Sequence, residues 1–117
     1  MTRKEALAKL ITAVEANSLA TVSAEHIYVA FGAHLQRRFW ECWNGSLDAV
    51  KALHEAVLPD FIAYPEAGGA SVGVRVWSCT VESWIEGQEY HGSNQPEPSR
   101  AWLLSILRAL HAQETAA

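Results

Sequence analysis

The amino-acid sequence predicts an α+β fold in which a three-stranded antiparallel β-meander packs with about four helices. Apolar residues recur with a helical period over residues 47–58 and 98–112, and the stretch between them changes to the two-residue period of strands. Consecutive strands with short connections favour an antiparallel meander. We expect helices at residues 3–16, 24–36, 47–58 and 98–112, and strands at 60–65, 70–79 and 82–91.

Length and composition favour one globular domain over residues 1–117. Hydrophobic residues make up 50% of the chain and charged residues 19%, which is typical of a soluble protein. No apolar run approaches the roughly 20 residues that a membrane span needs. The opening residues also lack a signal-peptide core, so the expected location is the cytoplasm.

The charge balance disfavours a nucleic-acid-binding role. The net charge is −4, and the nine basic residues are spread along the chain. Arg37 and Arg38 form the only adjacent basic pair away from the N-terminus. Because nucleic-acid affinity depends on Lys and Arg that neutralise phosphates, we expect no dedicated phosphate-binding surface.

The N-terminal third predicts two helices and one ambiguous segment. Thr2 and Glu5 have the spacing of a capping box, and Asn17 is suited to the left-handed conformation that ends a helix. Ser23 is a candidate N-cap for the second helix. The aromatic-rich segment 39–43 is predicted either to continue that helix or to cover the core as a lid, and its aromatic side chains are either core or an exposed docking surface.

The helix at 47–58 begins with Ser46 as N-cap and ends at Pro59. His54 lies within its apolar arc, between Val50 and Leu58. A histidine at such a position is either a buried general base or, more commonly, a hydrogen-bonded group at the core margin. No nucleophile lies near it in sequence, so we favour the structural interpretation.

The strand region has a clear first half and an ambiguous second half. Residues 61–64 predict a strand that Pro65 stops, followed by a turn at 66–69. Alternation then places Val72, Val74 and Val76 on one face, and a polar set on the other: Ser71, Gly73 and Arg75, with Trp77 and Cys79 in phase. The register of the third strand is open, and Glu82, Glu86 and Glu89 on it are interpreted as a solvated edge.

The final helix starts at Pro98 and is apolar over more than half of its circumference, which predicts that it forms the centre of the structure. No sequence motif indicates catalysis. The chain has no phosphate-binding glycine loop and no zinc-ligand spacing, so we expect neither a cofactor nor a metal. Cys42 and Cys79 are interpreted as buried structural thiols, although a nucleophilic Cys–His pair assembled in space remains an alternative.

Residues 44–59 and 98–110, together with the opening 2–7, resemble a group of short phage- and prophage-encoded proteins called the phage ABA sandwich domain family. The resemblance covers about half of the chain. It implies a bacterial, phage-related origin and a helix–sheet–helix sandwich, and it implies no reaction or catalytic residue. Because one predicted sheet face is polar, that face is either partly open or incompletely covered by helices.

These observations predict a small accessory protein without enzymatic activity that acts through protein–protein contact. The candidate contact residues are Trp77, Trp84 and Arg75 on the less apolar sheet face. A homodimer through that face is also expected. The alternative is a nucleic-acid-handling module, because a meander followed by a long helix is similar in outline to double-stranded-RNA-binding domains.

Overall fold

The computed structural model describes residues 1–71 and 74–116, and for residues 68–71, 74, 75 and 116 only the backbone. It has the predicted α+β architecture, with five α-helices and a three-stranded antiparallel sheet in this part of the chain. The elements in order are α1 (Arg3–Glu15), α2 (Ala24–Phe31), a 3₁₀ turn η1 (Ala33–Leu35), α3 (Gln36–Trp43), α4 (Leu47–Val57), β1 (Phe61–Ser71), β2 (Val74–Ser83), β3 (Glu89–Gln95) and α5 (Pro98–Ala116).

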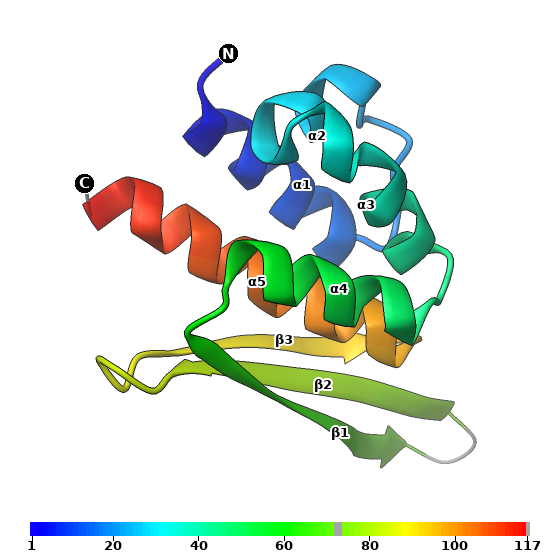
Figure 1. Cartoon of the computed structure of the whole chain (residues 1–117). Coiled ribbons are helices and arrows are strands. Elements are labelled where there is room, and N and C mark those ends of the chain that lie inside the picture. The colour runs from blue at the N-terminus through cyan, green and yellow to red at the C-terminus, as the bar shows by residue number, and fades with distance from the viewer. Residues whose placement is uncertain (72–73, 117) are drawn as a thin grey trace.

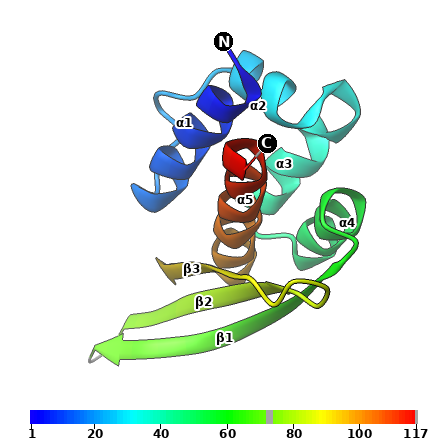
Figure 2. The ribbon, with the colours of Figure 1, turned by 90° about the vertical axis from the view of Figure 1, so that its left-hand side faces the viewer.

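All described helices lie on one side of the sheet (Figures 1 and 2). Helices α4 and α5 lie nearest to the strands, and α1, α2 and α3 cover them from above. The opposite face of the sheet carries no helix in either view. The sheet is therefore covered by helices on one face only.

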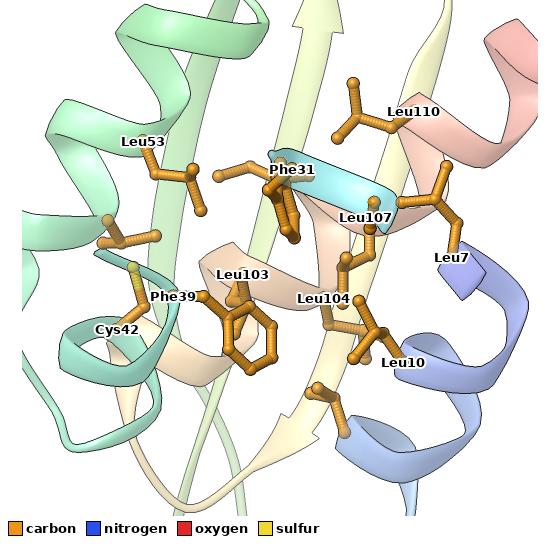
Figure 3. Close-up of a cluster of buried hydrophobic side chains, with 14 of the residues drawn as sticks. Leu7, Leu10, Phe31, Phe39, Cys42, Leu53, Leu103, Leu104, Leu107 and Leu110 are labelled. Carbon is orange, nitrogen blue, oxygen red and sulfur yellow. The ribbon is translucent and has the colours of Figure 1, made fainter. Parts of the chain in front are cut away.

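Helix α5 is the centre of the core, as its apolar circumference predicts. It contacts β3 and β2 on one side and α1, α3 and α4 on the other. Figure 3 shows Leu103, Leu104 and Leu107 of α5 meeting side chains from α1 and α3. The apolar residues of α5 that are at most 2% exposed are Ala101, Leu103, Leu104, Ile106, Leu107, Ala109 and Leu110.

Helix boundaries follow the local capping signals. Thr2 and Glu5 form the predicted capping box, and Asn17 takes the left-handed conformation with φ of 56°. Ser46 accepts a hydrogen bond from the backbone N–H of Ala49, as expected of an N-cap. The predicted helix 24–36 is instead divided, because Gly32 has φ of 80° and ends α2. The aromatic segment continues as a separate helix, α3.

The strands are displaced from their predicted positions. Strand β1 passes through Pro65 and the predicted turn, and continues to Ser71. Pro65 is tolerated because β1 is an edge strand, where a missing N–H costs no ladder hydrogen bond. Residues 82–83 belong to β2, and β3 starts only at Glu89. Glu82, Glu86 and Glu89 therefore lie on β2, in the connecting turn and on β3, not on one edge.

The two faces of β2 are the reverse of the prediction. Cys79, Val81 and Ser83 are buried on the helix side, and Trp77 shares their face because the β1–β2 register is regular between residues 76 and 83. The predicted positions of Ser71, Val72, Gly73, Val74 and Arg75 fall where side chains are not described. The open face instead carries Ile62 and Tyr64 of β1 with the partners Glu82 and Thr80 of β2 and Glu89 and His91 of β3.

The closest approach between sheet and helix is at Gly92 of β3. A Cβ atom at this position would lie 2.9 Å from both Leu104 Cβ and Ser105 N, and closer still to the carbonyl oxygen of Ala101. These contacts are mainly backbone, so they cannot move aside as a flexible side chain can. The absence of a side chain at Gly92 thus sets the distance between β3 and α5.

We predict that Gly92→Ala lowers the free energy of unfolding by about 1–3 kcal/mol, because the added methyl group overpacks this contact. Chemical denaturation monitored by circular dichroism measures the change. Ser93→Ala, at the exposed neighbouring position, is the control and should have almost no effect. Equal stability of Gly92→Ala and the wild type would contradict the inferred close packing.

Candidate functional site

The predicted contact residues do not form one cluster. Trp84 is 68% exposed and lies in the turn between β2 and β3. Trp77 is half-buried on the helix-covered face, where the prediction placed it on the open face. Arg75 belongs to β2, but its side chain lies outside the described part of the structure. Only Trp84 is thus an exposed aromatic residue among the three.

The turn that carries Trp84 is fixed by its own hydrogen bonds. The Ser83 hydroxyl accepts from the N–H of Glu86, and the Ser83 carbonyl accepts from the N–H of Gly87 at 2.7 Å. Gly87 has φ of 73°, a conformation that favours glycine. The N–H of Trp84 also donates to the carbonyl of Asp60, which ties the turn to the start of β1. The exposed side chains therefore project from a backbone that these hydrogen bonds hold in place.

Ile85 is the second exposed apolar residue of this turn, at 74%. We call Trp84 and Ile85 the hairpin tip. Residues 82–91 were predicted as a strand of open register, a prediction that did not single out Ile85 as exposed. The available signal was Gly87, because a glycine inside a strand pattern suggests a bulge or a turn. Two adjacent large apolar side chains in solvent favour a role in contact with another molecule.

A cleft of about 850 Å³ lies next to the hairpin tip. Its walls come from the turn, from the first residues of β1 and from the C-terminal end of α5, which lie at the same end of the molecule in Figures 1 and 2. Among its lining residues are Asp60, Phe61, Ile85, Glu86, Tyr90 and His111. The lining contains two carboxylates and no Lys or Arg. This cleft could not be predicted from the sequence, because its walls come from segments that are distant in the chain.

The aromatic segment of α3 is divided between core and surface. Phe39 is completely buried, and its ring lies 5.9 Å from that of Phe31. Trp43 packs against the core, whereas Trp40 is 39% exposed. The segment is therefore core at Phe39 and Trp43 and exposed at Trp40, and a docking role of Trp40 stays a prediction.

His54 has a structural environment. It is 6% exposed, Trp102 Nε1–H donates to its Nδ1 at 3.0 Å, and its Nε2 lies 2.8 Å from the carbonyl oxygen of Phe61. Because the indole can only donate and a carbonyl can only accept, the ring must carry its proton on Nε2. A groove of about 370 Å³ lies beside it, but neither ring nitrogen is free to act there as a base.

The thiols are poor nucleophiles. Burial raises the pKa of the Cys42 thiol to about 12 and that of Cys79 to about 11. Both thiols are therefore protonated at neutral pH, whereas a nucleophilic cysteine reacts as the thiolate. Within the described residues, the Cys79 thiol donates to the carbonyl of Thr80, and no hydrogen bond joins either thiol to a histidine.

The two arginines of α5 are used within the fold. Arg100 donates to the carbonyl of Trp43 at 2.8 Å, and its guanidinium lies 3.8 Å from the centre of the Trp43 ring. Arg108 pairs with Glu15 at 3.1 Å and also donates to the carbonyl of His91. Neither guanidinium is available as the start of a phosphate-binding surface.

No group of three or more His, Cys, Asp or Glu side chains in residues 1–71 and 74–116 is placed to hold a metal ion. Over the same residues, no helix combines the length and the apolar character that crossing a membrane requires.

Comparison of the chain with family models, with curated proteins and with solved structures finds no match. The resemblance to the phage ABA sandwich domain family therefore stays a prediction from the sequence. The site must be judged on its own geometry.

We predict that His54→Leu lowers the free energy of unfolding by about 1–3 kcal/mol, because it leaves the Trp102 indole N–H without an acceptor. Urea denaturation measures the change, and His34→Leu at an exposed position is the control. Nitrogen-15 NMR of the wild type should show His54 protonated at Nε2 only. A neutral effect of the substitution would contradict the structural role.

Proposed function

We propose that this protein is a small accessory protein, of the phage-related kind that its sequence resembles, and that it acts by protein–protein contact without catalysing a reaction. The hairpin tip is the contact element. The observation that carries the proposal is that the side chains of Trp84 and Ile85 are highly exposed while hydrogen bonds hold the backbone of their turn in place. Such an element loses little conformational entropy on binding.

The nature of the two exposed residues supports this proposal. Tryptophan is enriched among the residues that contribute most to binding energy at interfaces. The adjoining cleft supplies a concave surface next to a protruding one, and a partner segment can contact both. The cytoplasm remains our expected location.

A nucleic-acid-handling module is the second candidate, and one observation favours it. Elements α4, β1, β2, β3 and α5 follow one another as helix, three strands and helix, with both helices on the same sheet face. This outline is similar to double-stranded-RNA-binding domains, which is an analogy of fold only. This candidate is disfavoured because Arg100 and Arg108 form hydrogen bonds or ion pairs within the fold, so they are not free to bind phosphates. Retardation of RNA in a gel at low salt would reverse this ranking.

The contact proposal is tested by placing a photoreactive benzoylphenylalanine at position 84 and irradiating the protein in bacterial lysate. We expect a discrete crosslinked polypeptide at position 84 and none at position 28, because Tyr28 is a matched exposed aromatic residue on α2. Competition by unmodified protein should remove the crosslink. Competition by the Trp84→Ser/Ile85→Ser variant should leave the crosslink in place.

The same variant provides the stability control. Because Trp84 and Ile85 are 68% and 74% exposed, we expect the double substitution to change the free energy of unfolding by about 0.5 kcal/mol or less. Identical crosslinks at positions 28 and 84, or none at 84, would contradict the proposal.

We also propose a two-fold dimer that uses the open sheet face. Ile62 and Tyr64 are 38% and 44% exposed on this face and supply its apolar part. Glu82 lies directly opposite Glu89 in the β2–β3 register. Self-pairing would bring these carboxylates together, so added salt should strengthen the dimer by screening them.

Light scattering at low and high salt measures this assembly. We expect the dimeric fraction to rise with salt, and to fall on Tyr64→Ser while Tyr28→Ser leaves it unchanged. A monomeric mass at high micromolar concentration under both conditions would contradict the dimer.

A further inference from the structure

We propose that the cleft beside the hairpin tip receives an arginine side chain from a segment of the partner protein. This inference rests on the proposed function and adds the chemistry of the partner to it. It follows from three properties of the cleft: its carboxylates, its aromatic rings and the apolar rim that the tip provides.

The first property is charge. Asp60 lies at the start of β1 and Glu86 in the turn, so two chain segments bring a carboxylate to one cleft. No ion pair neutralises either group within the described residues, and the lining supplies no Lys or Arg. A cationic group of a partner is the complement of this lining.

The second property is aromatic surface. Phe61 and Tyr90 both line the cleft, and their ring centroids are 6.3 Å apart with an interplanar angle of 41°. A planar guanidinium stacks on such rings and donates to carboxylates through a fixed fork of N–H groups. An ammonium group is a compact, strongly hydrated charge without that planar surface. The cleft therefore favours arginine over lysine.

The third property is the rim. Ile85 both lines the cleft and belongs to the hairpin tip, so a chain that places its arginine in the cleft also passes over Ile85. A volume of about 850 Å³ leaves room beside an arginine side chain for the residues that flank it. The expected ligand is thus an arginine with apolar neighbours in an exposed protein segment.

A ¹⁵N-resolved NMR titration with two small probes tests the inference. Acetyl-arginine amide carries the guanidinium, and acetyl-citrulline amide has nearly the same shape without the charge. We expect saturable shifts at Asp60, Glu86, Tyr90 and His111 with the arginine probe, and roughly fivefold weaker binding of the citrulline probe. Acetyl-lysine amide with a free ε-amine should bind more weakly than the arginine probe.

Matched variants complete the test. Asp60→Asn with Glu86→Gln should abolish the preference for arginine over citrulline. Asp48→Asn with Glu25→Gln removes the same two charges from exposed helix positions and should retain the preference. The amide spectra of both variants report whether the fold is kept. Equal binding of the probes to the wild type, shifts centred away from the cleft, or an unchanged preference in the cleft variant would overturn the inference.

The two experiments together distinguish a failure of the arginine inference from a failure of the proposed function. A crosslinked partner at position 84 combined with no preference for the arginine probe would overturn the arginine inference alone. Arginine preference without any crosslink at position 84 would overturn the docking proposal and this inference together, and would assign the cleft to a small basic ligand.

Discussion

The fold depends on the enclosure of α5. This helix contacts the sheet on one side and α1, α3 and α4 on the other, and most of its apolar residues are almost completely buried. Gly92 allows β3 to approach its backbone, and Arg100 ties its first turn to α3 through the ring and carbonyl of Trp43. Helix α5 covers one face of the sheet and is itself covered by α1, α3 and α4. The hydrophobic core is therefore closed without a helix on the other face of the sheet.

This enclosure determines which surfaces remain free. The far face of the sheet is left open, with Ile62 and Tyr64 beside the carboxylates of Glu82 and Glu89. The β2–β3 turn extends beyond the strands at the end where α5 terminates, and the cleft lies between them. The hydrogen bonds of Ser83 tie the turn. The exposed tip is thus a consequence of packing elsewhere in the molecule.

The helical part of the fold could be predicted because its signals are local. Capping at Thr2 and Ser46, the end at Asn17 and the central position of α5 follow from short-range spacing and apolar periodicity. The strands could not be placed as well, since Pro65 is acceptable only on an edge, and edge position depends on the whole sheet. The predicted face of Trp77 was wrong because Cys79 and Val81, in phase with it, are buried under the helices, and the exposure of Ile85 was missed because residues 82–91 were predicted as one strand.

Of the candidate site, only Trp84 was predicted as a contact residue, and it was expected on the less apolar sheet face whereas it lies in the β2–β3 turn. The cleft is lined by Asp60, Glu86 and His111, which come from three separate parts of the chain. Their spacing in the sequence does not predict that they lie close together. His54 shows the opposite case. Its position in an apolar arc predicted a hydrogen-bonded group at the core margin, and its contacts with Trp102 and Phe61 have that character.

The proposed contact requires a hairpin tip that is rigid while exposed, and ¹⁵N relaxation of the backbone amides at residues 83–88 measures this rigidity. We expect order parameters of about 0.85, as in the rigid backbone of the helices. Values below about 0.6 for Trp84 and Ile85, with rigid strands on both sides, would contradict it.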